Sequence, residues 1–464
     1  METKPTLNND IYNNLSSWYI QNPVYPTQSS TVSLGGSQTQ IFFNIPANVY
    51  NLNKTKIAWD ASLATAAYTV GNIVSKRLSL FDYIYSIVIY DQSTGFIVQE
   101  IKNLDTLSKM QQLYVNPLNN RDSTRGFLYK SVRTDQTLAT ANTSDPYFQV
   151  TNAGAHLNAL SRGGTAINND FKANGLYSTI VAAGNNGAIL QLPSIQEELC
   201  NIINDSIFSL KKDLYLQNIV VKIVLNQISK ILTNCAAGYG EATVLSAFDG
   251  AAINLSNFRL IMFMQGDNAL NVAVKEKALL GTQTFIIPEL VDNMITISAS
   301  SNHTINITFS SKFQRSKLYK YYHFICTSSA GNVNLNNFSL ATDITQVDVY
   351  YQNTKIKTIQ NNATTTSTSC NGLFKDILSM YKTNNYYNYD DFNNDSFISH
   401  VFDSEKVECD DLMEWNKNKW TGIEFVGSNS LQFQCTLAGN YTKNHFVFVV
   451  LQSLLFQTNG VFHA

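Results

Sequence analysis

The sequence predicts an all-β protein with two antiparallel β-sandwiches in tandem. Aromatic residues make up 12% of the chain, including 24 Tyr and 26 Phe, and these side chains favour strands. Short runs of alternating apolar residues recur in both halves of the chain, and turn residues separate them. A length of 464 residues exceeds what one hydrophobic core usually organises, so two units are expected.

The composition describes a packed globular protein. Apolar residues make up 44% of the chain and charged residues only 14%, which is typical of a folded chain and not of a disordered one. The formal net charge is −2 and the sequence pI is about 6.3. Because no overall positive field attracts phosphate groups, sequence-specific nucleic acid is not an expected partner.

Residues 1–38 are interpreted as an N-terminal arm. They are rich in polar residues, contain Pro23 and Pro26, and end in a flexible Leu-Gly-Gly-Ser segment at 34–37. Two readings stay open: a loosely ordered terminus, or an arm that Trp18 and its neighbours anchor on another subunit. The start of the sequence lacks the apolar segment of a signal peptide, so synthesis in the cytosol is expected.

The first set of strands is assigned to residues 39–268. Residues 57–63 alternate as a half-buried strand does, and 85–90 form a second strand that a turn at 91–95 closes. Apolar residues at helical spacing predict a short helix near 100–114. Residues 115–190 are too long for a simple loop, so they are interpreted as elaborated insertions.

Two later segments of this first set have unusually apolar patterns. Residues 219–225 and 258–264 alternate, but both faces of each run are largely apolar. A strand of this kind is expected to be covered on both sides.

The pattern restarts after a more polar stretch at 265–277, and residues 269–464 are assigned to a second sandwich. Strands are predicted at 305–309, 347–351, 431–437 and 446–451, with short helices or turns at 372–383 and 395–416. A shared T-Q…F-x-I-P pattern opens each set, at 39–46 and at 282–288. This match is short enough to arise by chance and supports a duplication only weakly.

Four parts of the sequence resemble the double jelly-roll major capsid proteins of the lineage that includes adenoviruses, tailless phages, virophages and polinton-like viruses. The parts are residues 43–46 with 52–59, residues 87–107, residues 208–214 with 219–226, and residues 255–260. They cover the first half of the chain better than the second.

The resemblance implies two eight-stranded antiparallel jelly-roll β-sandwiches, with short helices and inserted loops that form small outward towers. It implies a structural protein of a double-stranded DNA virus, without enzymatic activity, that forms pseudo-hexameric homotrimers in an icosahedral shell. The implied partners are other copies of the chain, neighbouring capsomers, penton and minor capsid proteins, and an inner membrane as a further candidate. The implied location is the virion.

Histidine and cysteine patterns do not predict a metal site. The histidines are scattered, and each is expected to be a surface or interface side chain: His156, His303, His323, His400, His445 and His463. The cysteines show no C-x-x-C pair and are expected to be reduced and mostly buried: Cys200, Cys235, Cys326, Cys370, Cys409 and Cys435. No catalytic residue, cofactor or metal ligand is therefore assigned.

Two acidic groups have some of the residues that a binding or catalytic site requires. Asp391, Asn393 and Asp395 resemble the start of an EF-hand loop, but Ser396 and Phe402 stand where Gly and Glu are required. A second group comprises Asp410, Asp411 and Glu414. It could supply an acid–base pair, but a solvated helix end is the preferred interpretation.

One basic and aromatic segment is the best nucleic-acid candidate. It interleaves cations with aromatic side chains: Lys312, Phe313, Arg315, Lys317, Tyr319, Lys320, Tyr321 and Tyr322. Cations hold phosphates and aromatic rings stack on bases. Because the whole chain is not basic, a strand whose charged face is wet or pairs with a neighbouring subunit is preferred.

The predicted function is therefore that of a self-assembling shell subunit. An alternative is a β-sandwich adhesin or receptor-binding protein whose insertions at 115–190 bind a ligand. A third hypothesis, a carbohydrate-active enzyme, requires two carboxylates about 5–10 Å apart in a groove, and the sequence places no such pair.

Overall fold

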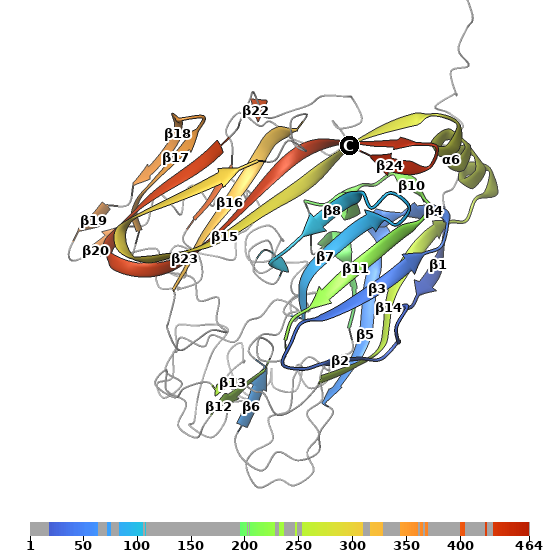
Figure 1. Cartoon of the computed structure of the whole chain (residues 1–464), viewed down its shortest axis with the longest axis horizontal. Coiled ribbons are helices and arrows are strands. Elements are labelled where there is room, and N and C mark those ends of the chain that lie inside the picture. Colours follow the sequence, from blue (N-terminus) through green and yellow to red (C-terminus); the bar gives the residue numbers. More distant parts are fainter. Residues whose placement is uncertain are drawn as a thin grey trace, which may run out of the picture.

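The computed structural model confirms the all-β class, because antiparallel strands dominate and α6 (Asn268–Leu280) is a single regular helix among the described residues. The structure describes residues 18–63, 72–75, 83–104, 107, 195–201, 203, 205–227, 232–235, 246–247, 253–309, 316–327, 344–360, 362–364, 367–369, 400–403, 423–424 and 430–463. Strands gather into two units that lie side by side (Figure 1).

The first unit has two main sheets. One contains β10 (Asp213–Leu216), β4 (Asn48–Asn51), β14 (Ile253–Gln265), β5 (Lys56–Leu63) and β9 (Ile195–Glu198), with β1 (Tyr19–Val24) and β2 (Val32–Leu34) also paired to β14. The other contains β3 (Thr39–Ile45), β11 (Ile219–Leu225), β7 (Ile84–Asp91) and β8 (Ile97–Ile101). A small separate sheet joins β6 (Asn72–Ser75), β12 (Leu232–Cys235) and β13 (Ser246–Ala247).

Late strands occupy the middle of both main sheets. β11 pairs with β3 and β7, and β14 pairs with β4 and β5, all antiparallel. Strands from the end of the unit therefore lie between strands from its beginning, as in Greek-key sandwiches. β11 is buried along both faces except at Lys222, which confirms the prediction that this strand is covered on both sides.

Aromatic rings join the two sheets of the first unit. Phe258 on β14 stacks on Phe43 of β3 with ring centroids 5.7 Å apart, and on Trp59 of β5 at 5.2 Å. All three side chains are fully buried. Large stacked rings between sheets supply much of the apolar burial that holds a sandwich together.

The predicted turn at 91–95 is confirmed. Asp91 Oδ1 accepts hydrogen bonds from the backbone amides of Ser93 and Thr94, at 2.8 and 3.3 Å. Gly95 has φ +72°, a left-handed conformation that glycine adopts without steric cost. The turn connects β7 to β8 and fixes their pairing register.

The second unit is built on a long antiparallel pair, β15 (Thr282–Thr308) and β23 (Ser430–Thr458). Their sheet also contains β16 (Lys317–Thr327), β17 (Ile344–Tyr351), β18 (Thr354–Gln360), β21 (His400–Asp403), β22 (Ile423–Glu424) and β24 (Val461–His463). A separate hairpin pairs β19 (Asn362–Thr364) with β20 (Ser367–Ser369).

This one sheet supplies both layers of the second sandwich. Residues 431–437 of β23 pair with β17, whereas residues 443–452 pair with β16. The β15–β23 register shifts between Ile297 and Asn302, where the ladder bends. Beyond the bend the layers face each other, because Tyr321 of β16 meets Phe433 of β23 edge-on with centroids 5.3 Å apart.

Several predicted elements differ from the observed ones. Residues 431–437 and 446–451 belong to the single strand β23, since its partner β15 continues opposite both segments. Residues 400–403, predicted as helix or turn, form β21 because they pair with β16. The polar stretch at 265–277 contains most of α6, whose first turn Asp267 caps by accepting from the Leu270 amide at 3.0 Å.

The part of the predicted arm that the structure describes lies on the first unit of its own chain. β1 pairs with β14 from Tyr19 to Val24, and β2 pairs with the same strand. Within the predicted helix at 100–114, Leu104 and Leu107 are helical and buried. Residues 105–106 and 108–114 lie outside the described ranges. The insertions at 115–190 and the predicted helix at 372–383 also lie outside them.

In the described part of the chain, no helix combines the length and apolar character needed to span a membrane.

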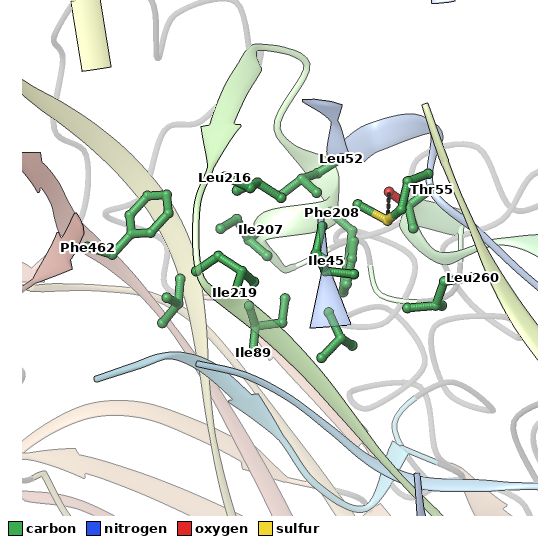
Figure 2. A pocket seen from close by; sticks show the side chains of 13 residues that line it. Ile45, Leu52, Thr55, Ile89, Ile207, Phe208, Leu216, Ile219, Leu260 and Phe462 are labelled. Atoms are coloured by element: carbon green, nitrogen blue, oxygen red, sulfur yellow. Dashed lines mark hydrogen bonds between the residues drawn. The ribbon is translucent and has the colours of Figure 1, made fainter. Parts of the chain in front are cut away.

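A small apolar cavity lies inside the first unit, next to the chain's last strand. Its volume is about 20 Å³, and Figure 2 shows the surrounding side chains, including Ile207, Ile219 and Phe462 of β24. Its one polar lining residue, Thr55, already donates a weak hydrogen bond to Met262 Sδ at 3.8 Å. The cavity is far smaller than ligand pockets, which are roughly 300–1,000 Å³, so it is a packing defect.

Replacement of Phe462 tests how firmly the C-terminal strand is packed. Phe462→Ala should lower the free energy of unfolding by about 3–5 kcal/mol, because the lost ring enlarges an existing cavity. Urea denaturation measures the loss, and Phe462→Leu should restore more than half of it. Equal stability of the wild-type and alanine chains would contradict this packing.

Candidate functional site: the junction of the two sandwiches

The β15–β23 ladder passes from the first unit into the second. Its end at Thr282 and Thr458 lies beside α6 and the first unit, and its far end lies in the second unit (Figure 1). The short strand β24 pairs back onto β23, and the Gly460 amide donates to the carbonyl of Ala278 in α6 at 2.9 Å. The ladder thus forms a continuous bridge between the units.

Gln99 of β8 ties the units together through both ends of its side-chain amide. Its Nε2 donates to the carbonyl of Pro288 on β15 at 2.9 Å, and its Oε1 accepts from the Ile207 amide at 2.7 Å. Gln99 is only 1% exposed, so these bonds form away from water. A buried amide with both ends paired fixes the register of the elements that it joins.

Further polar contacts cross the junction. The Tyr322 hydroxyl of β16 donates to Asp205 Oδ2 at 2.9 Å, and Gln457 Nε2 of β23 donates to the carbonyl of Tyr215 on β10 at 2.7 Å. Asn103 Nδ2 donates to Asp292 Oδ2 of β15 at 2.7 Å. Burial raises the pKa of the Asp292 carboxyl, while the bond from Asn103 opposes that shift.

The apolar core is also shared. One contiguous cluster of buried side chains includes Phe43 and Leu216 of the first unit together with Ile287, Phe448 and Phe462 of the last strands. Domains that move independently usually have separate cores and small polar interfaces. The two sandwiches are therefore expected to behave as one rigid body.

Large apolar side chains remain exposed at several places on this body. Among the described residues they are Trp18, Ile20, Tyr25, Ile97, Val272, Leu280, Met294, Ile295, Ile356 and Tyr441. Trp18 and Ile20 belong to the N-terminal segment, and Val272 and Leu280 to α6. Exposed groups of this kind are available for contacts with other chains.

Three histidines that the sequence analysis assigned to surfaces are buried instead. His303, His323 and His445 come from β15, β16 and β23 and meet inside the second sandwich. His303 Nδ1 lies 2.7 Å from His445 Nε2, and His445 Nδ1 lies 3.0 Å from His323 Nε2. His463, in contrast, is exposed. The scattered sequence positions concealed this cluster because sheet pairing brings them together.

The partners of the outer histidine set the tautomers. His303 Nε2 lies 3.1 Å from the carbonyl oxygens of both Ser300 and Tyr441, which only accept hydrogen bonds. His303 therefore carries its proton on Nε2, and its Nδ1 accepts from His445 Nε2–H. Burial lowers the pKa of His445 to about 2 and also lowers that of His303, so both rings are neutral at physiological pH.

The basic and aromatic segment does not form an open nucleic-acid surface where it is described. Tyr321 and Tyr322 are buried in the core, and their strand β16 lies between β23 and the strands β21 and β22. Lys317 and Lys320 stand opposite Glu424 and Asp403 in those pairings. Rings inside a sandwich cannot stack on bases, so this candidate is disfavoured.

Other candidates from the sequence lie mostly outside the described residues. These are Lys312, Phe313, Arg315, Asp391, Asn393, Asp395, Ser396, Asp410, Asp411 and Glu414. Phe402 is on β21. Of the cysteines, Cys435 is buried and Cys200 is partly buried.

Several of the solved structures that match this chain come from viruses. The mavirus major capsid protein matches with a TM-score of 0.49 and 11% identity, covering 100% of this chain and 95% of its own. A chain from the structure of the Sputnik virophage matches with a TM-score of 0.48 and 14% identity, covering 100% and 92%. VP54 of PBCV-1 matches with a TM-score of 0.46 and 8% identity, covering 97% of both chains.

No protein-family model and no curated protein sequence matches this chain.

Gln99→Leu tests the junction directly. The leucine fits the volume but leaves the Pro288 carbonyl and the Ile207 amide buried without their partner, which should cost roughly 2–5 kcal/mol of unfolding free energy. Urea denaturation measures the loss. Gln283→Leu on β15 is the matched control, because its side chain is partly exposed, and it should change stability by less than about 0.5 kcal/mol. Equal losses for both variants would contradict the role of Gln99.

The buried histidines predict that stability falls in mild acid. As the pH drops below about 6.5, the unfolded chain takes up protons that the folded chain excludes, which lowers the unfolding free energy. His445 alone should contribute about 1 kcal/mol per pH unit over this range. Denaturation at pH 7.5 and pH 5.5 measures the effect. His463→Gln should retain it, and a wild-type chain equally stable at both pH values would contradict the burial of neutral histidines.

Proposed function

We propose that this chain is the major capsid protein of a double-stranded DNA virus and that it works by self-assembly. The observation that carries the proposal is the rigid tandem block: two antiparallel β-sandwiches share one core and one continuous ladder. A shell subunit needs a fixed outline, because its neighbours dock on surfaces contributed by both units.

The residues that resemble the capsid family also build the framework of the first unit. Residues 43–46 and 52–59 include the end of β3 and the first half of β5, and 87–107 include the second part of β7 and all of β8. Residues 208–214 include the start of β10, 219–226 contain β11, and 255–260 lie in β14. Both sheets of the sandwich thus contain these stretches, which supports a family likeness in the core and not only in surface segments.

Two sandwiches per chain favour a homotrimer as the building block. Three copies around an axis present six sandwiches, so a trimer acquires a roughly hexagonal outline, and hexagons tile a surface without gaps. We propose that such pseudo-hexameric trimers form an icosahedral shell. The exposed apolar side chains of the N-terminal segment and α6 are available for the contacts between copies.

The proposed partners follow from this role. They are further copies of the chain, neighbouring capsomers, and penton and minor capsid proteins, with an inner membrane beneath the shell as a further candidate. The proposed location is the virion after synthesis in the host cytoplasm. The protein is proposed to act without catalysis or sequence-specific contact with nucleic acid.

The native mass of the purified full chain tests the proposal. Light scattering on a sizing column should give about three times 51.8 kDa, and the mass should persist on dilution because obligate interfaces bury large apolar areas. Negative-stain images should show three-lobed particles with a hexagonal outline. A stable monomer that binds a glycan or a cell surface would contradict the capsid proposal and favour a receptor-binding protein.

A further inference from the structure

A cysteine lies next to the three buried histidines. Cys435 of β23 stands directly opposite His303 of β15 in the ladder register. On the other side of the bend, His445 pairs with Ile325, two residues along β16 from His323, so both histidines point to the same face. The four side chains therefore come from both layers of the second sandwich and meet near the bend.

Three of these side chains have the geometry of a metal-binding site. The ligand atoms of His323, Cys435 and His445 all lie within 4.8 Å of one another, and all three side chains are buried. Tetrahedral zinc holds nitrogen at about 2.0–2.1 Å and sulfur at about 2.3 Å, so neighbouring ligand atoms stand roughly 3.3–3.8 Å apart. A shortening of the longest separation by at most about 1.0–1.5 Å, shared between the side chains, would reach that arrangement.

We propose that His323, Cys435 and His445 bind a zinc ion that links the two layers of the second sandwich. Two imidazoles and one thiolate select zinc over magnesium or calcium, which prefer oxygen ligands. Three protein ligands leave a fourth tetrahedral position for a water molecule. This site is independent of the proposed capsid role, because it concerns the interior of one chain.

His303 acts as a positioning residue for the ion. Because His303 Nδ1 accepts from His445 Nε2–H, the lone pair of His445 lies on Nδ1, the atom that faces His323 at 3.0 Å. Ser300 and Tyr441 hold His303 in turn through their carbonyl oxygens. Hydrogen-bonded partners of this kind fix the tautomer and orientation of a metal-ligating histidine.

Ionisation of the thiol determines the pH dependence of binding. Burial raises the pKa of Cys435, so the free thiol is protonated, and zinc must displace that proton to form the Zn–S bond. The thiol proton leaves to solvent, one for each ion bound, and if His323 binds through Nε2, the proton that Nε2 shares with His445 Nδ1 moves to His323 Nδ1. Lys443 is buried beside the cluster, with its Nζ 4.7 Å from the Tyr441 ring centroid, and its positive charge repels the zinc ion. The negative charge of Asp348, which raises the pKa of Cys435, attracts the ion.

The metal content and cobalt spectrum of the full-length chain test the proposal. Elemental analysis of protein purified without chelator should give one zinc per chain. After removal of the zinc, added Co²⁺ should give a thiolate-to-cobalt charge-transfer band and the strong visible bands of tetrahedral coordination. Cys435→Ser should abolish the charge-transfer band, and Cys200→Ser should retain it because Cys200 lies in the first unit. His303→Gln should keep the band but weaken zinc binding by roughly 10–100-fold.

Two outcomes would overturn the proposal. Wild-type chain without zinc and without a charge-transfer band on Co²⁺ addition would show that the cluster is a hydrogen-bonded histidine chain only. A charge-transfer band that persists in Cys435→Ser would place the ion elsewhere. The cobalt spectra of the wild-type chain and of Cys435→Ser report on the ligands directly and do not depend on a change in stability. If Cys435→Ser fails to fold, the zinc content and cobalt spectrum of the wild-type chain still test whether the site exists. A chelator should also lower the wild-type melting temperature, because zinc binds the folded chain only.

Discussion

The antiparallel ladder between β15 and β23 is the constraint on which the rest of this structure depends. β15 runs from beside the first sandwich across the junction into the second, and β23 runs back antiparallel to it. Every other strand of the second unit's main sheet attaches to β23 directly or through a neighbour. The bonds of Gln99 and Gln457 then tie the same two strands to the first unit. The β15–β23 ladder thus determines the strand order of the second unit's sheet and the orientation of the second unit relative to the first.

The bend in this ladder also accounts for the polar cluster inside the second sandwich. Between Ile297 and Asn302 of β15 the register shifts, and on either side of this bend β23 pairs with a different third strand, β16 or β17. His303 and His445 lie on either side of this bend and meet across it. Burial of a polar group costs free energy unless the group is hydrogen-bonded. The series of hydrogen bonds that links the three interior histidines therefore offsets the cost of burying them.

Local patterns predicted the framework well and the long-range contacts poorly. Alternating apolar residues located β5, β7, β11 and β14 because each has the period of two that a strand imposes. The same pattern divided β23 in two, since its polar middle around Asn440 resembles a turn and only pairing with β15 keeps it extended. The sequence pattern did not predict α6, because only Ala278 of this helix is fully buried and the helix has almost no apolar stripe. The histidine cluster joins residues 142 and 122 positions apart, a separation that no local spacing reveals.

The central claim is that the ladder and the shared core make the two sandwiches one cooperative body. Native-state hydrogen exchange along β23, followed at increasing denaturant, tests it most directly. Amides at 431–437 in the second sandwich and at 449–457 beside the first should exchange with the same free energy of opening, because neither end can open alone. Two distinct free energies, with one end of β23 opening while the other stays protected, would contradict the account.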